Sequence, residues 1–172
     1  KKNMNQENYK KKLIKISALV FDIDGVMTNG KVLITSKGEM LREMDTKDGY
    51  AIRCAVMENY KIGIISGGKN EGVRFRLKDL GVKNIFLGQT EKDSAFKEFR
   101  SKYKLENDQI LYMGDDVPDI SIMKKVGISA CPSDAVSDVK SISDYVSHKK
   151  GGEGCVRDVI EQVLRVHGKW KS

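Results

Sequence analysis

The amino-acid sequence predicts an α/β protein with a Rossmann-like, doubly wound, mainly parallel sheet that carries helices on both faces. Short β-branched runs alternate with segments of helical periodicity from Ile16 to His167, which is the pattern of βαβ units. The length of 172 residues is that of one domain, long enough to bury about 70% of the unfolded surface around one core. A composition of 40% hydrophobic and 32% charged residues with 2 prolines is that of a globular protein.

The elements can be placed in chain order from their patterns. The expected strands are Ser17–Phe21, Ile62–Ile65, Asn84–Leu87, Gln109–Met113, Gly127–Ala130 and a weaker Tyr145–Val146. The expected helices are Gly49–Glu58, Glu71–Leu80, Asp93–Tyr103, Asp119–Lys125 and Gly154–Val166. The last helix places apolar residues at helical spacing, so we expect it to dock on the sheet.

The connection between the first strand and the first helix is unusually long. It spans about 25 residues, whereas such loops usually have about 2–6. Within it Val32–Thr35 and Met40–Glu43 flank Ser36–Glu39, a pattern typical of a β-hairpin. We expect a small flap over about residues 26–46 and no cap domain.

The net charge of +7 is concentrated at the N-terminus. Residues 1–12 hold five lysines and one glutamate, and they lack the arginines and interleaved aromatic residues of a nucleic-acid-binding arm. We therefore expect a solvated basic tail over residues 1–12, a single domain over residues 13–172, and no nucleic-acid partner. No signal-peptide pattern or membrane-spanning run is present, and the three cysteines show no CxxC spacing, so we expect a soluble cytoplasmic protein without membrane partners.

Polar residues follow four of the expected strands. They are Asp22 and Asp24 after the first strand, Ser66-Gly67-Gly68 after the second, Lys92 after the third, and Gly114-Asp115-Asp116 with Asp119 after the fourth. The carboxyl ends of parallel strands meet at one edge of a sheet, where ligands bind in open α/β folds. Each motif alone is more often a turn, a cap or a solvated residue, but the whole set in order indicates one site.

The chemistry of this set is that of phosphoryl transfer. Asp22, Asp24 and Asp115 bring carboxylates together, and two such charges 4 Å apart repel by about 4 kcal/mol at an effective dielectric constant of about 20. Oxygen-only ligands favour Mg²⁺ as the counter-ion. A phosphate would be held by Mg²⁺, Lys92, Ser66 and backbone N–H groups such as that of Gly67. Asp22 would attack phosphorus, and Asp24 would act as the acid and base.

These motifs resemble those of the haloacid dehalogenase superfamily of phosphatases. Within this superfamily the sequence resembles in particular the family of 3-deoxy-D-manno-octulosonate 8-phosphate (KDO 8-phosphate) phosphatases. The segments that carry this resemblance are FDIDGVMTNG, the hairpin, DTKDGYAIR, YMGDDVPD and GGEGCVRD. It implies hydrolysis of KDO 8-phosphate through an aspartyl-phosphate in lipopolysaccharide precursor synthesis. It also implies a homotetramer in which the flap and tail of neighbouring subunits cover the site.

The resemblance assigns roles to individual positions. It implies Asp22 as nucleophile and Asp24 as acid/base, and it places Mg²⁺ on Asp22, the main-chain carbonyl of Asp24 and Asp115, with Asp116 and Asp119 behind these ligands. Ser66, Gly67 and Lys92 would hold the phosphate. Substrate contacts would fall on Asp24, Asp45, Thr46, Lys47, Asp48, Gly49, Arg53, Arg76 and Lys92.

Two departures from the family leave the substrate open. Many relatives have arginine where this chain has Gly68 and Glu153, so a phosphatase for a nine-carbon acid, such as KDN or sialic acid 9-phosphate, is an alternative. Two further alternatives are a receiver-like phosphoacceptor domain, which would not turn over a sugar phosphate, and a basic nucleic-acid-binding protein. The order of Lys92 before GDD and the paired aspartates favour the phosphatase.

Overall fold

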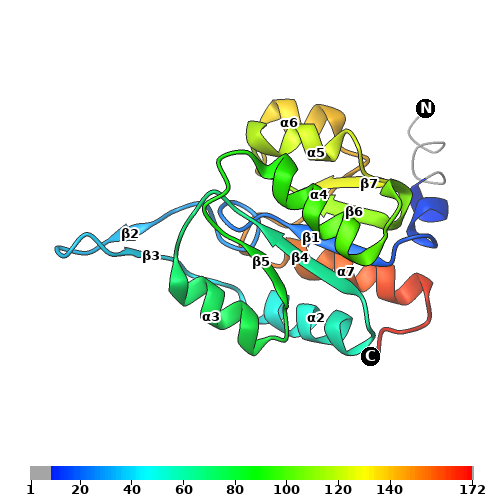
Figure 1. Cartoon of the computed structure of the whole chain (residues 1–172), viewed down its shortest axis with the longest axis horizontal. Coiled ribbons are helices and arrows are strands. Elements are labelled where there is room, and N and C mark those ends of the chain that lie inside the picture. The colour runs from blue at the N-terminus through cyan, green and yellow to red at the C-terminus, as the bar shows by residue number, and fades with distance from the viewer. Residues whose placement is uncertain (1–8, 172) are drawn as a thin grey trace.

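The computed structural model of the chain describes residues 9–171, and six of its strands form the central sheet (Figure 1). Every pair of neighbouring strands in this sheet is parallel, in the order β5-β4-β1-β6-β7-β8. The predicted doubly wound α/β fold is therefore confirmed. The strands are β1 (Ala18–Phe21), β4 (Lys61–Ile65), β5 (Asn84–Phe86), β6 (Ile110–Met113), β7 (Ile128–Cys131) and β8 (Tyr145–Val146).

The helices agree with the predicted ones, with two additions. The α-helices are α2 (Thr46–Met57), α3 (Glu71–Asp79), α4 (Lys92–Tyr103), α5 (Ile120–Met123), α6 (Ser137–Ile142) and α7 (Cys155–Val166). Short 3₁₀ helices, η1 (Asn107–Gln109) and η2 (Val117–Asp119), precede β6 and α5. The sequence did not predict η1 or α6. The six residues of α6 bury only Val139, which leaves no apolar periodicity to detect.

The core lies in two layers, one on each face of the sheet. Leu19 and Phe21 of β1 pack with residues of α2, α3 and α7, whereas Ala18 and Val20 pack with residues of α4, α5 and α6. This alternation follows from the two-residue period of a strand. Because helices cover both faces, β1 is buried along its whole length.

The described part of the N-terminal segment packs against the domain. Residues 9–13 are helical, and the Tyr9 ring stacks on Tyr145 with ring centroids 4.9 Å apart. The Tyr9 hydroxyl donates a hydrogen bond to Gln162 at 3.2 Å. The prediction of a solvated tail thus fails for Tyr9, which is buried, whereas Lys10 and Lys11 are exposed; the remainder of that tail, residues 1–8, lies outside the described residues.

The predicted flap forms a short antiparallel hairpin of β2 (Leu33–Ile34) and β3 (Met40–Leu41) that projects from the sheet (Figure 1). All four strand residues are exposed, Leu33 and Ile34 by more than 60%. A two-stranded hairpin without a packed face is marginally stable by itself. One contact with the body is a hydrogen bond of 2.8 Å from the Asn70 side chain to the Met40 carbonyl.

The order of the strands opens a crevice at the carboxyl end of β1. This strand lies between β4 and β6, and the helices that follow those neighbours, α3 and α5, pack on opposite faces of the sheet. Ligands of open α/β sheets bind at such a switch point. Among the described residues no helix is long and apolar enough to span a bilayer.

Candidate active site

The loop after β1 turns sharply and brings Asp22 to the edge of the sheet. The Asp22 N–H still donates to the Met113 carbonyl of β6, at 3.1 Å, and the Asp22 side chain is buried. Three N–H groups of the following turn donate to the Ile23 carbonyl at 2.8–3.2 Å. Gly25 has a φ of +88°, and a Cβ there would lie 2.0 Å from an Asp115 carboxylate oxygen. Glycine is therefore required for this loop to approach Asp115.

Lys92 is the first residue of α4 and lies buried between two carboxylates. Its Nζ is 2.9 Å from Asp22 Oδ2 and 2.7 Å from Asp119 Oδ1. Burial opposes the charged form of the lysine, but the two carboxylates outweigh it and hold the pKa of Lys92 above its ordinary value. Lys92 is thus a fixed cation beside Asp22.

Asp119 organises the loop after β6. Its Oδ2 accepts hydrogen bonds from the N–H groups of Asp115 at 3.1 Å and Asp116 at 3.3 Å, while its Oδ1 accepts from Lys92 and from the Tyr112 hydroxyl at 2.6 Å. Burial raises the pKa of Tyr112, so its hydroxyl stays a donor. Both oxygens of Asp119 are thereby engaged, and sequence reasoning did not identify Tyr112.

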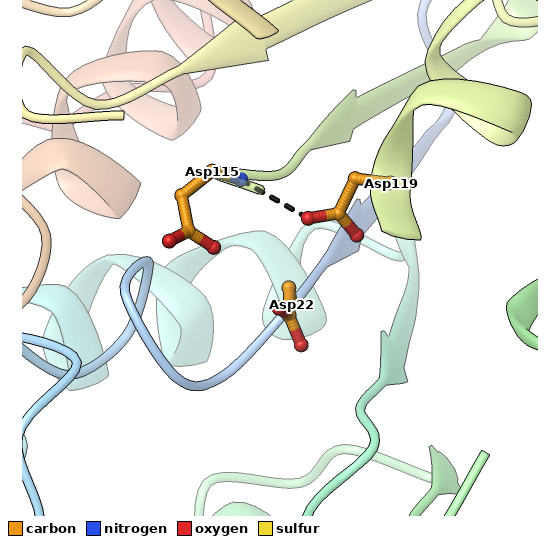
Figure 2. Close-up of side chains that lie close together, drawn as sticks. All are labelled: Asp22, Asp115 and Asp119. Atoms are coloured by element: carbon orange, nitrogen blue, oxygen red, sulfur yellow. Dashed lines mark hydrogen bonds between the residues drawn. The ribbon is translucent and has the colours of Figure 1, made fainter. Parts of the chain in front are cut away.

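Asp22, Asp115 and Asp119 form a carboxylate cluster, with one oxygen of each within 4.8 Å of the others (Figure 2). Burial raises the pKa of Asp22 to about 6, with Asp119 adding to the shift and Lys92 opposing it. Burial, then Asp22 and Asp119, raise the pKa of Asp115 to about 7. Oδ1 of Asp22 and Oδ1 of Asp115 are buried without a hydrogen-bond partner.

This cluster fits a hard divalent cation. Two buried oxygens that lack donors, in a group of carboxylates whose mutual repulsion raises their pKa values, are what Mg²⁺ or a similar ion would compensate. The predicted metal ligands Asp22 and Asp115 have these free oxygens, whereas the oxygens of Asp119 are already used. The Asp24 side chain lies outside the cluster, and only its main-chain carbonyl was expected to contribute.

The Ser66-Gly67-Gly68 loop forms the opposite side of the site. Ser66 is buried at the end of β4, its N–H donates to the Phe86 carbonyl at 2.9 Å, and its Oγ accepts from the Gly68 N–H at 3.3 Å. The Ser66 hydroxyl hydrogen therefore remains available to a ligand.

These loops enclose a cleft of about 390 Å³. Five aspartates and Lys92 supply its charged lining, so Lys92 is the one cation among its described lining residues. Gln89 and Thr90 also line it, and the sequence did not single them out because neither belongs to a charged motif. The lining comprises Asp22, Asp24, Gly30, Ser66, Gly67, Gln89, Thr90, Lys92, Asp115, Asp116, Pro118 and Asp119.

Arg42 is a site residue that sequence reasoning missed. It follows β3 of the flap, and its side chain is only 7% exposed. Its Nε and Nη2 donate to the two carboxylate oxygens of Asp24, at 2.9 Å and 3.0 Å. Such a bidentate pair fixes both groups. The sequence signal would have been an arginine directly after the two apolar residues that end the hairpin, Met40 and Leu41.

The predicted substrate contacts on α2 and α3 do not line the cleft. Asp45 caps α2 by accepting from the Lys47 N–H at 2.6 Å, and Arg76 pairs with Asp79 at 3.2 Å. Thr46, Lys47 and Arg53 are exposed, and Gly49 is buried beneath Arg76. Their role in substrate binding stays a prediction.

For Asp48 the structure points to a different role from the predicted substrate contact. Its side chain is buried, and its Oδ1 accepts from the Arg157 N–H at 2.7 Å. Gly154, the residue before α7, has no side chain with which to cap that helix, so α2 supplies the carboxylate. Burial raises the pKa of Asp48 to about 6.

The GGEG segment, residues Gly151–Gly154, packs against the loop after β1. The Gly152 N–H donates to the Val26 carbonyl at 2.9 Å, and a Cβ on Gly151 would lie 1.9 Å from the Gly25 carbonyl oxygen. The two loops therefore touch through backbone alone. Glu153 is exposed and lies beside the cavity between α2 and α7, outside the acidic cleft.

Comparisons with known proteins agree with this arrangement. Residues 78–160 match the haloacid dehalogenase-like hydrolase family. The chain is 37% identical to the 3-deoxy-D-manno-octulosonate 8-phosphate phosphatase KdsC of Salmonella typhi over 154 residues, which are 90% of this chain and 82% of that protein.

Two solved structures show the same fold. The 3-deoxy-D-manno-octulosonate 8-phosphate phosphatase of Yersinia pestis superposes with a TM-score of 0.93 at 31% identity, covering 95% of this chain and 88% of that one. The enzyme of the same name from Moraxella catarrhalis, in complex with a magnesium ion, a phosphate ion and KDO, gives a TM-score of 0.89 at 28% identity, covering 94% and 92%.

Proposed function

Because the chain belongs to the haloacid dehalogenase-like hydrolases, in the group of the KDO 8-phosphate phosphatases, we propose that it hydrolyses KDO 8-phosphate to KDO and phosphate. The observation that carries the proposal is the state of Asp22. This carboxylate ends the central strand, has one oxygen on Lys92 and leaves the other without a donor. A nucleophile and a metal ligand both need an oxygen that no donor occupies, and Asp22 is a lining residue of the cleft.

The phosphate would be bound by groups that already converge on the cleft. Lys92 offers the ammonium, Ser66 its hydroxyl, and the exposed backbone of Gly67 allows close approach of an anion. Phosphoryl transfer depends mainly on positioning and on neutralisation of charge, and these groups supply both.

The reaction would proceed in two steps on the carboxylates of the loop after β1. A carboxylate oxygen of Asp22 forms a bond to phosphorus while the bond from phosphorus to the sugar oxygen breaks, and Asp24 gives its proton to that oxygen. Asp24 then takes a proton from a water molecule that attacks the aspartyl-phosphate, which releases phosphate and restores Asp22.

Mg²⁺ is the proposed cofactor, and the relative from Moraxella catarrhalis carries one. The side chains of Asp22 and Asp115 and the main-chain carbonyl of Asp24 would hold it, with Asp116 and Asp119 behind them. When bound, the ion neutralises the carboxylate cluster and the phosphate oxygens. Lys92 keeps Asp22 oriented through the ion pair already described.

The nine-carbon alternative remains because of two residues. Gly68 adjoins the cleft and carries no charge, and Glu153 is acidic, so neither position offers a cation to the carboxylate of an eight-carbon acid. We also propose that the chain forms a homotetramer, since the exposed apolar flap of one chain needs a partner to cover it. The proposed substrate places the reaction in lipopolysaccharide precursor synthesis.

Steady-state kinetics with KDO 8-phosphate, KDN 9-phosphate and glucose 6-phosphate in Mg²⁺ test the proposal. We expect the highest kcat/KM for KDO 8-phosphate and a loss of at least about 10³-fold in kcat for Asp22→Asn. A clear preference for KDN 9-phosphate would reject the substrate and keep the reaction. Turnover retained by Asp22→Asn would reject the covalent mechanism.

A further inference from the structure

The charge of the cleft is incompletely matched to the proposed substrate. A sugar acid phosphate carries a phosphate and a carboxylate, yet Lys92 is the one cation among the described lining residues. Lys92 is already paired with Asp22 and Asp119. Arg42 is the guanidinium that touches a lining residue, through its pair with Asp24.

Arg42 is held in place independently of Asp24. Its Nη1 donates to the Met40 carbonyl at 2.9 Å, and the same carbonyl accepts from the Asn70 side chain at 2.8 Å. Asn70 is itself fixed because it caps α3 by accepting from the Val73 N–H at 2.9 Å. The guanidinium is therefore preorganised by the flap and by α3.

The guanidinium retains donors for a second partner. The hydrogen bonds to Asp24 and Met40 use three of its five N–H groups, which leaves one on each terminal nitrogen. Gly68 keeps this side of the pair free of a side chain, because a Cβ there would lie only 3.3 Å from both Arg42 Nη2 and Asp24 Oδ2, which is a tight contact.

Asp24 is the more exposed member of the pair. Its side chain is 35% exposed, against 7% for Arg42. Asp24 lines the cleft, but in the closed pair each of its carboxylate oxygens accepts a hydrogen bond from the guanidinium of the flap. A carboxylate on the substrate can replace Asp24 on Arg42 without leaving the buried guanidinium unpaired, whereas a neutral sugar cannot.

We propose that Arg42 binds the carboxylate of the substrate and that this exchange releases Asp24 toward the leaving group. The inference rests on the proposed function, because it assigns Arg42 to the acidic group of a sugar acid phosphate. It makes Arg42 a specificity-determining residue, and it couples recognition of the acid to the availability of Asp24.

The test compares kcat/KM for KDO 8-phosphate, KDN 9-phosphate and glucose 6-phosphate in the wild type, Arg42→Met and Arg42→Lys. The ratio that matters is kcat/KM for the better acid substrate divided by kcat/KM for glucose 6-phosphate. We expect Arg42→Met to reduce this ratio by at least about tenfold. Arg42→Lys keeps the charge without the two parallel donors of a guanidinium and should reduce the ratio by less. Lys37→Met is the matched control, since it removes an exposed flap charge at the hairpin turn and should leave the ratio unchanged.

Each outcome decides the proposal. If Arg42→Met lowers all three values equally, or leaves the ratio unchanged while thermal melting shows a folded protein, Arg42 does not recognise the carboxylate and the inference is overturned, with the proposed function intact. A wild type without preference for either acid overturns both. A wild type that prefers KDN 9-phosphate rejects only the proposed substrate, and the ratio for that acid then tests Arg42.

Discussion

Substitution of Asp48 distinguishes directly between a structural role of this residue and a contact with substrate. Asp48→Ala removes the acceptor of the Arg157 N–H at the start of α7. Loss of a cap costs about 1 kcal/mol, and a buried N–H left without a partner adds about 1–3 kcal/mol. We therefore expect the free energy of unfolding to fall by about 2–4 kcal/mol.

That loss converts into a measurable shift. For a chain of this size each kcal/mol lowers Tm by about 2–4 °C, so Asp48→Ala should melt about 4–16 °C below the wild type in scanning calorimetry. Asp48→Asn keeps an oxygen acceptor and should lose less than half as much. The KM of either variant, measured well below its Tm, should stay within about threefold, because the caps act on stability.

The opposite pattern would refute this reasoning. An Asp48→Ala protein with an unchanged Tm and a KM raised tenfold or more would show that the carboxylate contacts substrate and that the cap contributes nothing.

Four further predictions concern the carboxylate cluster and its supports. In the absence of metal, we expect the Tm of the wild type to fall relative to that of Asp115→Asn as pH rises from about 4.5 to 7.5. The pKa of Asp115 is raised to about 7, so the folded state binds this proton more tightly than the unfolded chain does and loses that advantage as the proton leaves. Melting curves without such a trend would contradict this expectation. Mg²⁺ competes with that proton, so it should raise Tm more at pH 8 than at pH 6, and an equal shift at both would place the ion elsewhere. Tyr112→Phe removes one donor to Asp119 and should lower the free energy of unfolding by about 1–2 kcal/mol in urea, with no loss indicating that the bond contributes nothing. Gly151→Ala should cost about 3 kcal/mol or more and lower kcat, since its Cβ meets the Gly25 carbonyl; a neutral variant would mean that the two loops separate freely.

The sequence predicted the fold and the centre of the site because both depend on local patterns. Runs of β-branched residues indicate strands, and residues at the carboxyl ends of parallel strands lie at the same edge of the sheet. Asp22, Lys92, Asp115 and Asp119 converge for this reason. No knowledge of distant packing was needed to place them together.

The remaining features depend on how distant segments pack. Asp48 carries the same charge whether it faces solvent or caps α7, and only the position of α7 separates these cases. Arg42 reaches Asp24 because Asn70 anchors the flap, a contact between segments 30 residues apart. Tyr9 joins the core through Tyr145, near the other end of the chain. Such pairings leave no periodic signal in the sequence.

The contact between the GGEG segment and the loop after β1 has a consequence for synthesis on the ribosome. Gly25 emerges early, but Gly151, on whose backbone its loop rests, follows 126 residues later. At about 5–20 residues per second the acidic loop waits roughly 6–25 s for that support. A nascent chain that already contains every carboxylate of the cleft should therefore remain unable to assemble it until the segment before α7 has left the exit tunnel.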